Sequence, residues 1–190
     1  MATDVELLID MALRLAGESP AHCGYGEEGG ALTVRRRLRQ LVEPAAAQAV
    51  REAPASVFAT WRELDPEGVT VEAGGCGYAL LPADFMRLLS FRMSDWRVAV
   101  ERVDEARGAC MGRLYPEAYA SPSRPVCRLG QRPEGRALLF AGSRSPTATL
   151  TQGLYVAQPR IDRRGTIEVP EELLAAIASK MLAIAAKSEG

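Results

Sequence analysis

The stretch GYALLPADFMRLLSF, residues 77–91, changes its hydrophobic period midway, and this change is the clearest indication of the fold. Pro82 pre-sets the backbone of a first helical position and keeps the preceding residue extended, so residues 81–84 predict the start of a helical turn. The residues that follow alternate as in a half-buried strand, with one side formed by Leu89, Phe91 and Met93. No catalytic motif has this form. We therefore predict an architectural junction between helical and strand structure.

Apolar residues at helical spacing predict three helical regions around this junction. The first begins with Thr3 and Glu6 as a capping box. The second runs from residue 31 to about residue 53, with Pro44 as a break or kink. The last begins at Pro170, and its early glutamates and later lysines suit the helix dipole.

The composition between the second and last helices shifts toward alternating apolar residues and turn sequences. Alternation predicts strands between about residues 69 and 103, including WRVAVERV, where Val98 and Val100 share a side. Three further strands are predicted between residues 125 and 157, at VCRLG, RALLFAG and TATLTQGLYVA. Their short Pro- and Gly-containing connections predict an antiparallel meander. Phe58 and Trp61 precede these strands and are expected to anchor the helices to them.

Together these patterns predict one α+β subunit spanning residues 1–190. Its helical body consists of the N-terminal, central and C-terminal helices, residues 1–62 and 168–190. A mainly antiparallel β lobe, about residues 68–160, is inserted between them. The apolar residues expected to share the core of the helical body are Val5, Ile9, Ile177 and Met181.

The composition is that of an ordinary globular protein. The chain is 47% hydrophobic and 25% charged with a formal net charge of −1, so it has no general attraction to nucleic acid or membranes. No apolar run has the length of a membrane span. The four cysteines are far apart and form no C-x-x-C pair, which argues against a zinc site. The first residues do not form a secretion signal, so we expect assembly in a cytoplasm and reduced cysteines.

The sequence offers little for catalysis. Its single histidine, His22, lies in the glycine-rich stretch AHCGYGEEGG, residues 21–30, without further metal ligands at workable spacing. This stretch lacks the Lys-Ser/Thr ending of a phosphate-binding loop and is predicted to be a flexible connection. Residues 104–124 are predicted to be a second long loop. With no cluster of carboxylates either, we predict that the chain is not an enzyme and binds no cofactor or metal.

Four arginines make the first half of the central helical tract strongly basic. They are Arg35, Arg36, Arg37 and Arg39. Charge runs on helices are more often solvated faces or interface charges than nucleic-acid sites, and no aromatic residue is interleaved here to stack on a base. We expect the four side chains to face solvent in the isolated subunit.

Four stretches occur in an order typical of one family. They are LLIDMALRLAGESP, then VFATWREL after a long helix, then YALLPADFMRLLSF, and last LTQGLYVAQPRID followed by IEVPEELLAAIASKMLAIAAKS. In this order they resemble the head-to-tail connector proteins of tailed bacteriophages, especially the tail-tubular or tail-adaptor proteins that extend the portal. The resemblance covers nearly the whole chain through degenerate motifs. The sequence departs from the family in the glycine content of residues 21–30 and in Val156, where a second aromatic residue is common.

The resemblance implies a structural subunit of the neck of a phage or prophage virion. Such a subunit docks on the portal protein, contacts tail proteins and forms a ring, expected to be dodecameric, through which double-stranded DNA passes without sequence-specific contacts. It needs no cofactor and no membrane. The isolated chain is expected to be a monomer or small oligomer, since its long loops gain order only when a portal offsets the entropy cost.

The resemblance also assigns roles to residues. Pro82, Asp84, Phe85 and Arg87 are expected to form a structural corner where the chain leaves the helical body and enters the β lobe. Asp84 is expected to cap backbone N–H groups and Arg87 to pair with an acidic side chain. The arginines from Arg35 to Arg39 are expected to contact the portal or the DNA channel.

An alternative stays open for the same basic helix. The chain is then a bacterial nucleic-acid-binding or protein-interaction module that uses Arg35 to Arg39 as its contact surface. Strongly salt-dependent DNA binding by the isolated chain would favour this hypothesis.

Overall fold

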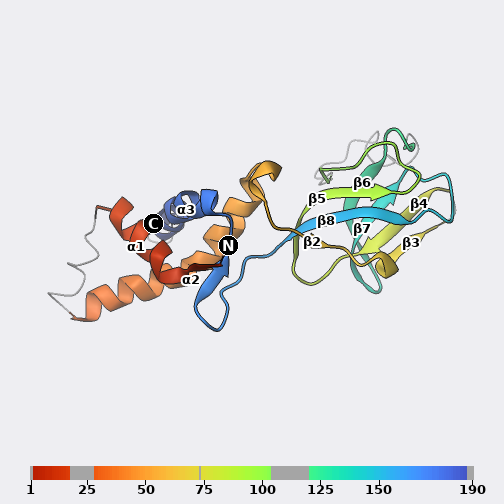
Figure 1. The fold of residues 1–190 in the computed structure, drawn as a ribbon. Helices are drawn as coiled ribbons and strands as arrows, with labels where there is room; N and C mark the ends of the chain where they lie inside the picture. Colours follow the sequence, from red (N-terminus) through yellow and green to blue (C-terminus); the bar gives the residue numbers. More distant parts are fainter. Residues whose placement is uncertain (1, 18–27, 73, 104–119, 188–190) are drawn as a thin grey trace. The chain divides into compact units, whose positions relative to one another are not determined.

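The computed structural model describes residues 2–17, 28–72, 74–103 and 120–187, with the side chains of residues 28–32 left out. Helices and antiparallel strands both occur in these ranges, which confirms the α+β class. The chain forms two compact units, Met1–Ala59 together with Gln158–Gly190, and Thr60–Ala157. We call them the helical unit and the β unit. The chain enters the β unit after Ala59 and leaves it after Ala157 (Figure 1).

Helices α1 (Val5–Leu15), α2 (Glu28–Glu52) and α3 (Leu174–Lys187) pack on one another in the helical unit (Figure 1). A two-stranded antiparallel ribbon of β1 (Ala2–Asp4) and β9 (Thr166–Glu168) lies in the same unit. Short 3-10 turns follow α2 at Ala55–Val57 (η2) and precede α3 at Glu171–Leu173 (η6). The four residues expected in this core, Val5, Ile9, Ile177 and Met181, are buried.

The start of α1 differs from the sequence prediction. Asp4 is the residue that caps the helix, because its carboxylate accepts the backbone N–H of Glu6 at 3.0 Å. Thr3 instead belongs to β1, where it pairs with Ile167 and is buried. The capping-box prediction was wrong by one residue, because the helix begins at Val5 and the Asp4 side chain occupies the cap position, while Thr3 pairs in the strand that precedes it.

Helix α2 also differs from its prediction at both the start and the middle. It begins at Glu28, so the loop prediction for residues 21–30 is wrong at its last residues, and the rest of that stretch, with His22, lies outside the described residues. The helix continues through Pro44. The hydrogen bond that proline removes is offset by burial of neighbouring residues, since Val42, Ala45 and Ala46 are fully buried.

The β unit contains two antiparallel sheets. The first has the order β3-β4-β7-β6, formed by Val69–Val71, Cys76–Leu80, Gly135–Ala141 and Val126–Arg132. The second has the order β2-β8-β5, formed by Arg62–Glu63, Leu150–Ala157 and Phe85–Met93. A 3-10 turn, η3 (Pro66–Gly68), connects β2 to β3.

Aromatic rings fill the core of the β unit. Trp96, after β5, is 2% exposed. Its ring meets Phe91 of β5 edge-on at 5.6 Å between centroids and Phe140 of β7 at 5.9 Å. Phe91 and Phe140 themselves lie 5.3 Å apart, so the cluster joins one sheet to the other.

The predicted meander of the last three strands is only partly correct. Strands β6 and β7 form a hairpin, but β8 pairs with β5 in the other sheet. The second edge of β7 is already occupied by β4, from Cys76 opposite Ala141 to Leu80 opposite Ala137. Strand β8 therefore cannot extend the hairpin of β6 and β7, and the chain crosses to the other sheet between β7 and β8.

The strand predicted at WRVAVERV is also wrong. Val100 forms a single bridge with Phe91, and Val98 is 46% exposed, so this segment lies beside β5 without a regular ladder. Of the loop predicted for residues 104–124, residues 104–119 lie outside the described residues.

The junction predicted at Pro82 needs correction. Residues 82–85 form a turn between β4 and β5, closed by a hydrogen bond of 2.9 Å from the Phe85 N–H to the Pro82 carbonyl. The corner therefore lies inside the β unit and joins its two sheets; it does not lead from the helices into the strands. Pro82 is the first residue of this turn, and the backbone angle that proline fixes is compatible with a turn as well as with the start of a helix, so its presence alone could not separate the two.

The crossing from β7 to β8 is held by one carboxylate. Asp95 accepts the backbone N–H groups of Arg144 at 2.6 Å and Ser145 at 3.2 Å, and the Ser143 hydroxyl at 3.1 Å. Burial acts to raise the pKa of Asp95, but these hydrogen bonds outweigh it and the pKa is lowered.

We predict that Asp95→Ala lowers the free energy of unfolding at pH 7 by about 1–2 kcal/mol, because loop donors lose a charged acceptor. A lowered pKa stabilises the folded state above the ordinary carboxyl pKa of about 4, and this contribution is lost as the pH falls through the folded value. The difference between variant and wild type in urea unfolding should therefore shrink below about pH 4. Glu134→Ala, an exposed carboxylate between β6 and β7, is the control and should change little.

Candidate interaction site

The corner residues belong to a polar cluster that ties three strands of the β unit together. The Asp84 carboxylate accepts the Tyr155 hydroxyl at 3.1 Å and forms an ion pair with Arg62. The Tyr155 ring stacks on Phe85, with centroids 5.6 Å apart. Arg62 lies on β2 and Tyr155 on β8, opposite each other in the ladder. These are the strands by which the chain enters and leaves the β unit.

The contacts of this cluster differ from those predicted for the corner. The sequence predicts that Asp84 caps backbone N–H groups, whereas the contacts just described are with side chains. Burial is the main cause of the raised pKa of Tyr155, and the hydrogen bond and charge of Asp84 add to it. Arg87 is half-buried, and its pKa is lowered by burial and by the charge of Arg102. The structure thus brings Asp84 and Phe85 together with Tyr155.

A groove of about 450 Å³ lies along the edge of the β2-β8-β5 sheet. Trp61 and Leu64 line it from the segment around β2, and Leu150 and Leu154 line it from β8. Glu63 and Arg92 add one charge of each sign to the lining. The groove is therefore partly apolar, with polar groups that could orient an occupant.

The groove exists because β2 is shorter than the strand it borders. Arg62 and Glu63 pair with Tyr155 and Leu154, and the Leu64 N–H donates to the Gly153 carbonyl at 2.7 Å. The chain then turns away at Pro66–Gly68. The first residues of β8 extend past β2, which leaves part of a sheet edge beside the groove. Open sheet edges are natural places for another chain to bind.

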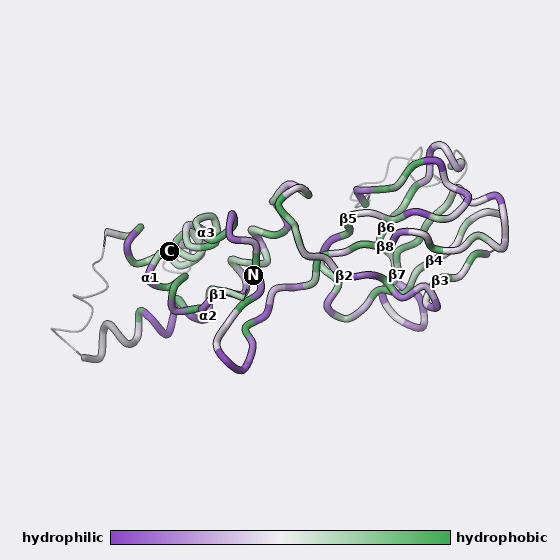
Figure 2. Tube along the Cα trace, viewed as in Figure 1, coloured by the Kyte–Doolittle hydropathy of each residue, from purple (hydrophilic) through white to green (hydrophobic). Residues whose placement is uncertain are grey.

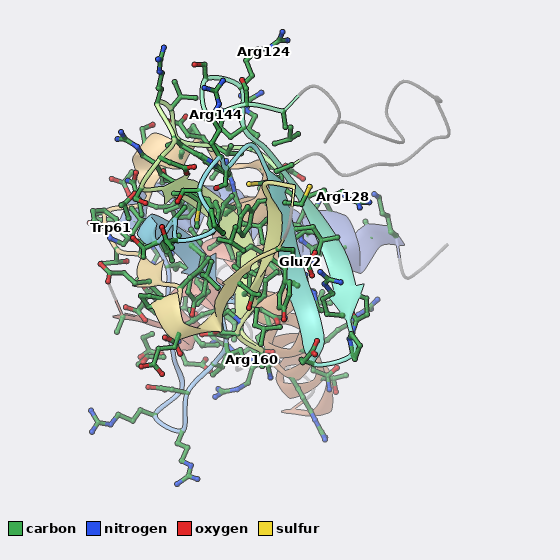
Figure 3. The ribbon with its side chains drawn as sticks, turned by 90° about the vertical axis from the view of Figure 1, so that its right-hand side faces the viewer. Trp61, Glu72, Arg124, Arg128, Arg144 and Arg160 are labelled. Atoms are coloured by element: carbon green, nitrogen blue, oxygen red, sulfur yellow. The ribbon has the colours of Figure 1, made fainter. Side chains whose placement is uncertain are left out.

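Trp61 is a large aromatic residue of this groove with a solvent-exposed side chain. It is 51% exposed, whereas the other tryptophan, Trp96, is 2% exposed. Figure 3 shows Trp61 at one edge of the β unit and Arg128 at the other. The sequence predicts Trp61 as an anchor of the helices, and this exposure gives that role no support. Large exposed aromatic side chains in a groove are typical of protein-binding surfaces.

Most of the arginines predicted as a contact surface form bonds within the helical unit. Arg35 forms ion pairs with Glu6 at 3.1 Å and Asp10 at 2.7 Å, and Arg39 pairs with Glu6 at 2.9 Å. These bonds link α2 to the acidic side of α1. Arg37 donates to the Ala185 carbonyl of α3 at 3.3 Å.

The four arginines also differ in solvent exposure. Arg36 and Arg39 are exposed, and Arg35 and Arg37 are half-buried, so the prediction that all four face solvent is only partly correct. Ion pairs at partly exposed positions contribute little to stability, about 0–1 kcal/mol each. They still occupy guanidinium groups that a portal or DNA contact would need. That contact stays a prediction.

The described residues contain no group of three or more His, Cys, Asp or Glu side chains placed to hold a metal ion. Cys127 is a buried free thiol, and burial raises its pKa far above the ordinary value. In the part of the chain that the structure describes, no helix has both the length and the hydropathy of a membrane span.

Comparison with known proteins adds no relative. No protein-family model matches the chain, and a search of curated proteins finds no match. The resemblance to phage adaptors therefore stays a prediction from the sequence.

The difference between the two tryptophans predicts a simple optical test. In a Trp96→Phe variant, Trp61 alone emits, and its fluorescence should be strongly quenched by iodide because the ring is open to solvent. In a Trp61→Phe variant, the buried Trp96 should be quenched several-fold less. Equal quenching of the two variants would contradict the exposure of the groove.

The Asp84 cluster predicts a shift in the titration of one phenol. In Asp84→Asn, the pKa of Tyr155 should fall toward its ordinary value, about 10, but not reach it, because burial, the larger cause, remains. The difference in ultraviolet absorbance between each protein and its Tyr155→Phe counterpart measures this. The raised pKa stabilises the fold below about pH 10 and this contribution is lost as the pH rises through the folded value, so wild type should lose more stability there than Asp84→Asn.

Proposed function

We propose that the chain is a structural subunit of a phage or prophage head-to-tail connector. It docks on the portal protein, assembles there into a ring with other copies, and helps to form the DNA channel and the attachment ring for tail proteins. It is located in the virion neck, and its function is to bind other proteins.

The observation that carries the proposal is the groove with exposed Trp61. A protein whose task is to hold neighbouring proteins needs an unfilled, partly apolar surface, and this groove joins such a surface to an open strand edge. Two stretches that carry the resemblance meet at this sheet, since FMRLLSF forms β5 and LTQGLYVA forms β8. The stretch WREL supplies Trp61 and β2.

The alternative, a nucleic-acid-binding module that uses Arg35 to Arg39, has less support. Three of these four side chains bond to Glu6, Asp10 or the Ala185 carbonyl, so only Arg36 is without a described partner. One free guanidinium cannot supply the several phosphate contacts that DNA binding requires.

We predict that light scattering will find the purified chain as a monomer or small oligomer, and that adding its cognate portal will produce a ring-sized complex. Trp61→Ala should weaken this association roughly 30-fold, the effect of losing an interface hot spot worth about 2 kcal/mol. Its own fold should hold, because the side chain is half in solvent.

Val98→Ala is the matched control, since Val98 is a large apolar side chain of the β unit that is 46% exposed and does not line the groove. It should bind the portal as wild type does. A portal that recruits no wild-type subunit would refute the proposed function. A stable ring from the chain alone would refute assembly on a portal template.

A further inference from the structure

A short arginine-rich loop follows β8 as the chain returns to the helical unit. Its sequence is RIDRRG, residues 160–165, and it leads into β9. Figure 1 shows this loop, in blue, projecting from the three helices, and Figure 2 shows it as hydrophilic. We call Arg160, Arg163 and Arg164 the basic tip. The sequence prediction did not include these residues, because the arginine run of the central helix is longer.

The loop is built to hold one conformation. The Asp162 carboxylate accepts the backbone N–H groups of Arg164 at 2.9 Å and Thr166 at 2.8 Å, and the Thr166 hydroxyl at 3.0 Å. The Gly165 N–H donates to the Asp162 carbonyl at 3.1 Å, and Gly165 has a φ of 78°, which favours glycine. The turn is therefore closed by bonds from both backbone and side chain.

The loop is also fixed to the helical unit. The Ile161 N–H donates to the Glu43 carboxylate of α2 at 2.8 Å, and the Val5 N–H at the start of α1 donates to the Gly165 carbonyl at 3.0 Å. These two hydrogen bonds hold the loop on both sides of the tip, so the backbone that carries the three arginines is fixed in position. Their positioning costs less entropy on binding than that of a free tail.

The guanidinium groups of the basic tip are free to bind a partner. Arg160, Arg163 and Arg164 are exposed, and within the described residues none of their side chains forms a hydrogen bond or ion pair. Asp162 is the only acidic residue between them, and its carboxylate is already occupied by the bonds of the turn. These bonds lower its pKa, that from the Thr166 backbone most, and the charge of Arg164 adds to the effect. This contrasts with Arg35, Arg37 and Arg39, which are engaged.

We propose that the basic tip binds the phosphate backbone of double-stranded DNA. Guanidinium groups match phosphate oxygens in charge and in paired hydrogen-bond geometry. Residues 158–166, all described, include no exposed apolar side chain, and a protein partner would need such an anchor at the centre of its interface. Contacts to phosphates carry no sequence information, so binding by the tip should be independent of the DNA sequence.

This inference deepens the proposed function, because it names the part of a connector subunit that meets DNA. It rests on that function only for its biological setting. Binding of the full chain to a DNA duplex is measured without a portal, and portal docking is measured without DNA, so the two can fail separately.

The test uses the full chain and a fluorescein-labelled random-sequence duplex of about 30 base pairs, with anisotropy measured over a series of salt concentrations. The variant is Arg160→Gln, Arg163→Gln and Arg164→Gln together. If the tip neutralises three phosphates, the slope of log K against log salt should fall in magnitude by about 2.7, and binding at 0.1 M salt should weaken ~100-fold or more.

A matched triple variant controls for net charge. Arg97→Gln, Arg124→Gln and Arg144→Gln remove the same charge from exposed positions of the β unit; Figure 3 labels Arg124 and Arg144. This control should keep the affinity and salt slope of wild type. Circular dichroism should show both triple variants folded, because all six side chains are exposed.

Four outcomes would overturn the inference. The first is a wild-type chain that does not bind the duplex at 50 mM salt. The second is a tip variant that binds as wild type does. The third is equal weakening by both triple variants, which would make the effect one of bulk charge. The fourth is a tip variant that keeps DNA binding but loses portal docking, which would make the tip a protein contact.

Discussion

The pairing of β8 is the constraint on which most of this structure depends. Because β4 and β6 occupy both edges of β7, β8 cannot pair with β7, and it joins the other sheet, where it lies between β5 and β2. The Asp95 carboxylate holds the loop that makes this crossing possible, and the core then closes around Phe91, Trp96 and Phe140. At its far end β8 places Tyr155 against Asp84 and continues toward the basic tip. Strand β8 thus contributes to the core of the β unit, lines the groove, and leads the chain toward the basic tip.

The arginines of the helical unit fall into two groups, those that pair with acidic side chains of the unit and those that do not. Glu6 and Asp10 on α1 lie within reach of Arg35 and Arg39, so these guanidinium groups bond within the unit. The loop at residues 160–165 contains one acidic residue, Asp162, and backbone and hydroxyl donors occupy its carboxylate. The neighbouring Glu43 carboxylate of α2 accepts the Ile161 N–H. Counting basic residues along the sequence favours the helix, whereas counting unpaired ones in the described structure favours the tip.

The sequence allowed prediction of what depends on local period. Val5, Ile9, Ile177 and Met181 were correctly assigned to a core because helical spacing marks one buried face. The turn at Pro82 was misassigned because proline suits two local structures, and the partner of β8 was misassigned because pairing depends on which edges are already occupied. The groove could not be predicted at all, since the exposure of Trp61 follows from the shortness of β2. The Arg-Arg-Gly of the tip was visible, but its freedom from ion pairs depends on tertiary neighbours.

The two candidate surfaces lie in different units, and this separation bears on how a connector subunit could work. Trp61 and its groove belong to the β unit, while the basic tip is anchored on Glu43 and Val5 of the helical unit. The two surfaces share no described contact, and side chains without shared partners contribute nearly independently to binding. Under the proposed function, the β unit would hold a protein neighbour and the helical unit would contact DNA, and neither contact would depend on residues that the other uses.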